Sequence, residues 1–171
     1  MNESLLVKQF SEIYYQNASE AELPPAGREA RARRHLQLLQ RLLREPLVEV
    51  STDEANPQRA QLMLVTPDRP FLIDSLRMDL DEQGIALHQL IHSVMALDRD
   101  SSGNIVSINP VNEGTRSDEK VSVIYGEIDR TADLNAVAEH IRAKIKVLNL
   151  IADDFPLMRT RLQEVRNQLN A

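Results

Sequence analysis

The chain has 171 residues, 42% of them hydrophobic and 27% charged, a composition typical of a globular protein with core enough for one domain or two small ones. It contains no cysteine, which excludes a disulfide scaffold, a thiolate metal site and a cysteine nucleophile. No glycine-rich phosphate loop, signal peptide or run approaching the roughly 18 apolar residues of a membrane span is recognisable, so a cytoplasmic location is expected.

The net charge of −6 is unevenly distributed. Residues 1–46 and 133–171 each carry a net charge of +1, whereas residues 47–132 carry −8. Phosphate binding needs clustered Lys and Arg, so the acidic middle disfavours nucleic acid as a partner.

The first 46 residues are expected to form a helical lead-in. Apolar residues at helical spacing predict one helix over 3–16 and a second over 27–44, which Pro46 ends. The second helix is rich in arginine, with Arg33, Arg34 and Arg41 as interface candidates. We interpret these arginines as contacts to the acidic middle of the chain or to another subunit, because residues 26–44 lack the aromatic anchors of a membrane-binding helix.

Residues 47–153 alternate between strand and helix patterns. Strands are predicted over 47–52, 61–66, 85–98, 105–109 and 121–129, with helices after Pro70 and after Asp133. Gly84 is placed to end the first of these helices in a left-handed conformation. This order predicts an α+β fold, an antiparallel sheet with helices on one face, preceded and followed by helices.

A corner between two helices is predicted at 153–156, where Pro156 interrupts the pattern. Residues 154–171 would then form a C-terminal helix that leads to the next domain. Its apolar residues Met158, Leu162, Val165 and Leu169 follow the 4-3-4 spacing of a packing seam.

Two histidines and a group of acids are the candidates for chemistry. His88 and His92 lie four apart, but on a strand they share one face at a separation of roughly 13 Å, too far for one metal ion. They are therefore interface candidates, with Leu90 between them. The acids Asp74, Asp79, Asp81 and Glu82 lack a convergent partner in the sequence and predict a solvated helix face. Asp74 is the exception, because its place in the first turn suits it to cap the helix or orient the loop before it.

The segment 67–72 is the most suggestive feature. A central strand feeds a loop bounded by two prolines and then a helix N-terminus, where free backbone N–H groups favour a small carboxylate. The same geometry also occurs as plain architecture.

At this segment the sequence resembles a known family. Residues 65–76 read VTPDRPFLIDSL and residues 84–94 read GIALHQLIHSV. Both resemble the amino-terminal region of the large bacterial NAD-specific glutamate dehydrogenases, with their V-T-D-D-x-P-F-L-V-D-S-V and G-I-x-I-H-x-x-I-H-P-V patterns. The end of the last strand and residues 153–159 are similar to that family too.

The resemblance implies an ACT-like regulatory region of an enzyme that oxidises glutamate to 2-oxoglutarate and ammonia with NAD. The catalytic domain would lie far downstream, so this segment would bind no NAD, cofactor or metal itself. ACT domains often hold small amino acids at the corresponding loop. The implied effector-site residues are Pro67, Asp68, Arg69, Pro70, Phe71, Leu72, Asp74 and Gly84.

Two departures from the ACT pattern stand out. Phe71 occupies a position where ACT domains typically have Gly. Its aromatic side chain would close the pocket or form an interface. The usual last strand is also missing, so residues 47–52 are predicted to take that edge position beside 61–66.

Two hypotheses follow. The first is a non-catalytic regulatory and assembly segment whose partners are downstream domains, other subunits of a homo-oligomer and an amino-acid effector. The alternative is a stand-alone interaction module that docks through an open sheet face bearing His88, Leu90 and His92.

Overall fold

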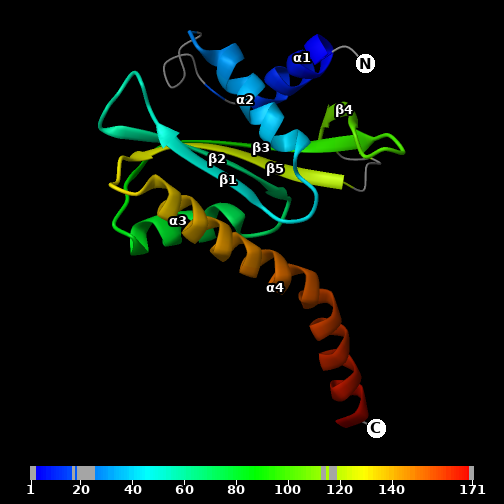
Figure 1. The fold of residues 1–171 in the computed structure, drawn as a ribbon. Coiled ribbons are helices and arrows are strands. Elements are labelled where there is room, and N and C mark those ends of the chain that lie inside the picture. The colour runs from blue at the N-terminus through cyan, green and yellow to red at the C-terminus, as the bar shows by residue number, and fades with distance from the viewer. Residues whose placement is uncertain (1–2, 17, 19–25, 113–114, 116–118, 170–171) are drawn as a thin grey trace.

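The computed structural model describes residues 3–16, 18, 26–112, 115 and 119–169 (Figure 1). The elements in chain order are α1 (Glu3–Tyr14), α2 (Arg28–Gln40), β1 (Leu47–Thr52), β2 (Arg59–Pro67), α3 (Leu72–Glu82), β3 (Leu87–Arg99), β4 (Ile105–Pro110), β5 (Glu119–Asp129) and α4 (Leu134–Leu169).

The five strands form one antiparallel sheet in the order β1-β2-β5-β3-β4. The short first strand lies at the edge beside β2, from Leu47 opposite Val65 to Thr52 opposite Ala60. This confirms the predicted rearrangement, in which an early strand takes the edge position that a last strand would otherwise fill.

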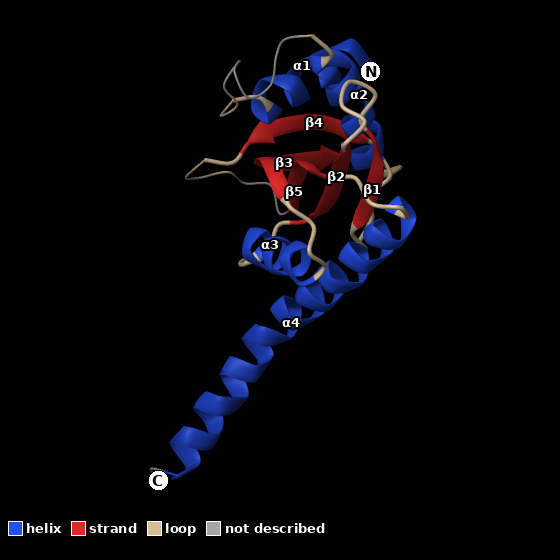
Figure 2. Cartoon of the chain, turned by 90° about the vertical axis from the view of Figure 1, so that its left-hand side faces the viewer, coloured by secondary structure: helices blue, strands red, loops and turns tan. Residues whose placement is uncertain are grey.

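The sheet lies between two layers of helices (Figure 2). Strand β2 shows why, because its side chains alternate between two apolar cores. Met63 and Val65 pack with α1 and α2, whereas Leu62 and Leu64 pack with α3 and α4. The α+β, ACT-like fold is confirmed, and the two lead-in helices cover the second face of the sheet.

The open sheet face of the alternative hypothesis is therefore not present in the expected form. Leu90 packs against the core that holds α3 and α4, and β3 also turns Ile91 and Met95 toward α1 and α2. The leucines of α2 predict a helix with an apolar face. They do not show which element that face will cover.

Helix α4 is continuous through Pro156, so the predicted corner is wrong. Proline removes one backbone hydrogen bond and bends a helix, but an exposed helix can continue past it. The Thr160 hydroxyl donates to the carbonyl oxygen of Pro156 at 3.0 Å, a contact within the turn that follows the proline.

The two ends of α3 are set by left-handed residues. Gly84 has a φ of 68° and ends the helix region as predicted. At the other end Phe71 precedes the helix with a φ of 63°, and no side chain caps the helix. Pro70 thus lies before the helix. In the part of the chain that the structure describes, no helix is long and apolar enough to cross a membrane.

Candidate functional site

The loop after β2 places Asp68 beside two polar side chains of the sheet. The Ser122 hydroxyl on β5 donates to Asp68 Oδ1 at 2.6 Å, and His92 Nε2 on β3 lies 3.0 Å from the same hydroxyl. Because Ser122 gives its one proton to Asp68, His92 must donate from Nε2. The three side chains therefore form one directed chain of hydrogen bonds that ends on a carboxylate.

Burial lowers the pKa of His92, and the nearby Asp68 charge opposes that shift. The imidazole is accordingly neutral at neutral pH, with Nδ1 as an acceptor. The site thus presents one carboxylate and one neutral acceptor.

A cavity of about 480 Å³ opens beside this chain. Its volume lies within the range of small-molecule sites. Asp68 and His92 supply its charged and titratable groups, and residues at or just after the ends of α1 and β4 also line it. The other lining residues are Ile13, Gln16, Ser93, Val94, Pro110, Val111 and Asn112.

The same loop is tied to α4. Arg69 Nη2 donates to Asp153 at 2.5 Å, so its guanidinium is directed at α4 and it does not line the cavity. One turn earlier on α4, Asn149 Nδ2 donates to the buried hydroxyl of Thr66 at 3.0 Å. These two contacts fix the position of the loop against the helix.

The structure separates the residues predicted for the effector site. Asp68 alone among them lines the cavity beside His92. Leu72 is buried in the core of α3 and α4, whereas Phe71 is 72% exposed and Asp74 is exposed on α3. The effector role of these residues stays a prediction.

Gly84 lies away from this loop, at the other end of α3. It lines a different cavity of about 660 Å³ with Arg59 and Asp129. Those two residues pair at one end of β2, and Pro67 pairs with Val121 at the other. Gly84 therefore cannot share a small ligand with Asp68.

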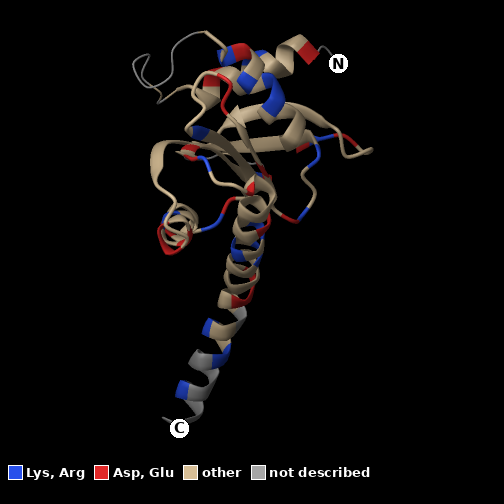
Figure 3. Ribbon diagram, turned by 60° about the vertical axis from the view of Figure 1, so that its left-hand side comes forward, with Lys and Arg blue, Asp and Glu red and all other residues tan. Residues whose placement is uncertain are grey.

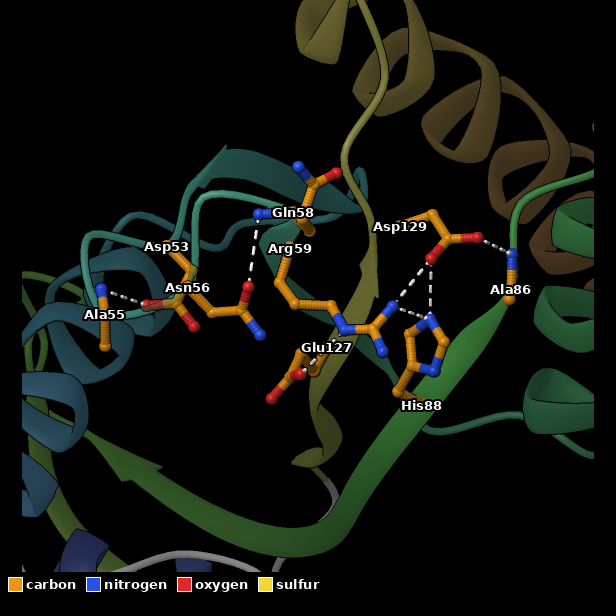
Figure 4. Close-up of polar contacts among 9 residues, drawn as sticks. All are labelled: Asp53, Ala55, Asn56, Gln58, Arg59, Ala86, His88, Glu127 and Asp129. Carbon is orange, nitrogen blue, oxygen red and sulfur yellow. Dashed lines mark hydrogen bonds and ion pairs between the residues drawn. The ribbon is translucent and has the colours of Figure 1, made fainter.

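His88 belongs to a polar cluster at this far end of the sheet (Figure 4). Arg59 Nη1 donates to Asp129 Oδ1 at 2.7 Å and lies against His88, while Arg59 Nε lies 3.3 Å from Glu127. His88 Nε2 contacts the same Asp129 oxygen at 2.7 Å. The cluster joins the ends of β2, β3 and β5.

Asp129 is the centre of this cluster. A hydrogen bond from His88 and one from the backbone N–H of Ala86 lower the pKa of its carboxyl group. His88 and His92 thus lie in separate hydrogen-bond networks on one strand. Among the described residues, no three His, Asp or Glu side chains are grouped to hold one.

Asp79 corrects the prediction of a solvated acidic face. It is 3% exposed, and His140 Nε2 contacts its Oδ1 at 2.9 Å. Lys144 lies 3.7 Å from the same oxygen, and Gln83 donates to Oδ2 at 3.0 Å. His140 and Lys144 both come from α4, more than 60 residues along the chain, which is why the local pattern missed them. Asp74, Asp81 and Glu82 are exposed as expected.

The arginines of α2 contact acids within the same chain. Arg34 and Arg41 both contact Glu49 on β1, at 3.6 Å and 3.2 Å. Arg33 contacts Glu29 at 3.0 Å and Glu3 at 3.5 Å. Two of the three arginines thus pair with an acid in residues 47–132 of the same chain. This is one of the two kinds of contact that the sequence left open, the other being contact with another subunit.

Comparison with known proteins decides the family. The profile of the glutamate dehydrogenase ACT1 domain matches residues 10–145, which is most of the chain. The chain belongs to this family. The match starts within α1 and ends within α4, so it includes the whole sheet and α3.

Two relatives of this ACT1 domain are NAD-specific glutamate dehydrogenases. The one from Pseudomonas aeruginosa is 31% identical over 102 residues, which is 58% of this chain and 6% of that protein. The one from Halomonas elongata is 26% identical over 107 residues, which is 61% of this chain and 7% of that protein. The matched region is thus a small fraction of each relative. No solved structure matches the chain.

Most residues of the candidate site in this ACT1 domain were missed from the sequence, Ser122, Ile13 and Gln16 among them. Ser122 alternates with Val121 and Val123 and is read as an ordinary strand residue until β5 is placed between β2 and β3. Ile13 and Gln16 reach the cavity because α1 packs on the sheet. No local signal marks such residues, since only the packing of distant elements brings them together.

Proposed function

We propose that this chain is a non-catalytic regulatory and assembly segment of an NAD-dependent glutamate dehydrogenase. In that proposal the parent chain converts glutamate to 2-oxoglutarate and ammonia with NAD, in the cytoplasm, and this segment adjusts it. Membership of the ACT1 family supports the regulatory role.

We further propose that the segment senses a small amino acid in the cavity beside Asp68. The carrying observation is that the cavity places a carboxylate and a neutral histidine acceptor at one side of about 480 Å³. An α-ammonium group suits both, because the carboxylate supplies charge and Nδ1 supplies a second acceptor. The amides of Gln16 and Asn112 are the donors available to the ligand carboxylate.

The lining also gives a preference among amino acids. Among the described residues that line the cavity there is no Arg or Lys, and Ile13, Val94 and Val111 are apolar. A second carboxylate on the ligand would lie near Asp68 without a cation to balance it. Neutral, apolar amino acids are therefore expected to bind more tightly than glutamate or aspartate.

Calorimetry on the 171-residue chain tests this proposal. We expect valine or alanine to bind, and propionate, which is alanine without its amino group, to fail. Asp68→Asn should weaken binding at least about tenfold, the scale of one lost charged contact, whereas the exposed Asp81→Asn should leave it unchanged. No heat with any amino acid at about 10 mM would remove the sensing half and leave assembly alone.

One observation supports assembly at the predicted histidine strand. Strand β4 pairs only with residues 95–99 of β3. Within the described chain, no strand pairs with residues 90–94 of β3 on the side away from β5. Such an edge can pair with a strand of another subunit. His92 and Leu90 lie on this stretch, and their interface role stays a proposal.

A further inference from the structure

A second cavity lies at the opposite end of the sheet from Asp68. Its volume is about 660 Å³, within the range of small-molecule sites. The turn between β1 and β2, the connection from α3 to β3 and the end of β5 all contribute to its lining. Strand β2 runs from Arg59 at this cavity to Pro67, next to Asp68, a span of roughly 26 Å. The two cavities therefore cannot share one small ligand.

The strands carry most of their charged residues at their ends, and one such end borders this cavity (Figures 3 and 4). Both carboxylate oxygens of Asp129 accept hydrogen bonds there, Oδ1 from Arg59 at 2.7 Å and Oδ2 from the backbone N–H of Ala86 at 3.2 Å. The guanidinium of Arg130 donates to the carbonyl oxygen of Pro57 at 3.3 Å and pairs with no acid in the described part of the chain. Arg130 therefore brings to the cavity a positive charge that no described acid neutralises.

The rest of the lining is polar. Ile85 is the only apolar side chain among the described residues that line the cavity, and Asn56 and Gln58 contribute side-chain amides. Asn56 Oδ1 accepts from the backbone N–H of Gln58 at 3.1 Å, so the side-chain N–H groups of Asn56 remain available as donors. Thr131 also lines the cavity, and its buried Oγ1 has no hydrogen-bond partner among the described residues. A ligand oxygen near Thr131 would satisfy that hydroxyl.

We propose that this cavity binds a small organic anion whose carboxylate or phosphate group pairs with Arg130 and whose remainder carries hydroxyl groups. A guanidinium holds either group through two parallel N–H···O bonds, so an oxoanion is the chemistry that the two kinds of ligand share. Ligand hydroxyls suit the amides of Asn56 and Gln58 and the hydroxyl of Thr131, because all of these groups can both donate and accept. Asp129 disfavours a second negative group on the ligand.

This inference does not rest on the proposed amino-acid site. Amide chemical shifts of the ¹⁵N-labelled 171-residue chain test it with three probes: glycerate, glycerol 3-phosphate and glycerol. The probes share hydroxyl groups and differ in the anionic group. We expect at least one of the two anions to shift the amide signals of Gly84 and Arg130, and glycerol at the same concentration to leave them unchanged. The anion that binds more tightly identifies carboxylate or phosphate as the preferred group.

Arg130→Gln tests the residue that carries the charge. It should raise the dissociation constant of the tighter anion at least about tenfold, the scale of one lost charged contact. Arg44→Gln is the matched control, because Arg44 is exposed and does not line the cavity, and it should leave the dissociation constant unchanged. Both variants should keep the melting temperature, since both side chains are exposed.

Thr131→Val separates a ligand contact from a structural role. Valine keeps the shape of threonine and removes a buried hydroxyl without a partner, so affinity for the anion should fall while the free energy of unfolding holds or rises. Unshifted Gly84 and Arg130 signals with both anions at about 10 mM overturn the proposal. Shifts that persist with the same dissociation constant in Arg130→Gln also overturn it. Equal shifts with glycerol overturn the anionic class of ligand.

Discussion

Asp79 on α3 and His140 on α4 lie 2.9 Å apart, and the carboxylate of this pair is 3% exposed. The contact joins two helices that share one face of the sheet. A buried carboxylate that loses its donors is costly, so the pair contributes to the docking of α4 on α3.

Replacement of Asp79 should destabilise the domain. Asp79→Ala removes the acceptor shared by His140, Lys144 and Gln83, and we expect a loss of about 2 kcal/mol in the free energy of unfolding. The loss stays moderate because His140 and Lys144 are about half exposed and can turn to water. Urea denaturation followed by circular dichroism measures it.

The exposed Asp81→Ala is the matched control and should change stability by less than about 0.5 kcal/mol. A double-mutant cycle with His140→Ala separates the pair from the rest of the cluster. Equal effects of Asp79→Ala and Asp81→Ala would show that the buried contact adds nothing.

The stability of the chain should fall in mild acid because of His35. This side chain is fully buried, accepts from the Tyr14 hydroxyl at 2.9 Å and contacts the carbonyl oxygen of Leu64 at 3.3 Å. Burial lowers its pKa from 6.5 to about 3, so only the neutral form fits. The unfolded chain takes up the proton first, and stability is therefore lost progressively as the pH falls below about 6.5.

At pH 5 the expected loss from His35 is about 2 kcal/mol relative to pH 8. The measurement is the free energy of unfolding by urea as a function of pH. The lowered pKa of His92 acts in the same direction, so His35→Leu should reduce the slope without abolishing it. Tyr14→Phe should lower stability at every pH and keep the slope. A slope that is identical in His35→Leu and the original chain would contradict the assignment.

Phe71 should be replaceable by glycine with a gain in stability. Its φ of 63° costs a non-glycine residue roughly 1–2 kcal/mol, and its side chain is 72% exposed. The greater freedom of glycine in the unfolded chain returns part of this, so we expect Phe71→Gly to stabilise the domain by about 0.5–1 kcal/mol. Thermal denaturation gives the value.

Phe71→Ala is the control, because alanine keeps the backbone strain and loses the ring. It should change stability by less than about 0.5 kcal/mol. A loss of stability in both variants would contradict the prediction. It would mean that the Phe71 ring makes stabilising contacts in solution, as an interface residue would.

Much of the secondary structure follows from local pattern. The alternation in 47–52 and 121–129 predicts strands because successive side chains point to opposite faces. Asp133 accepts from the backbone N–H of Ala136 at 2.9 Å, the N-terminal cap that the residue type predicts. Gly84 ends α3 for an equally local reason, its freedom at positive φ.

The exceptions depend on tertiary packing. Pro156 predicts a break, but helix α4 continues through it. The lead-in helices lie on the sheet because their apolar faces match one side of β2 and β3, which a linear pattern does not pair.

The amino-acid composition shows that a cysteine-free chain of this length can fold without disulfides. The sequence also shows that the negative net charge is concentrated in residues 47–132. The sequence also indicated the family through residues 65–76 and 84–94, and the profile match over residues 10–145 shows it. Only the tertiary structure shows which groups the acidic side chains contact. Glu49 pairs with arginines of α2, and Asp79 is buried against α4. Asp68 accepts a hydrogen bond from Ser122, which in turn contacts His92. Each of these contacts joins elements far apart in sequence, and their side chains meet only when the strands and helices are packed together.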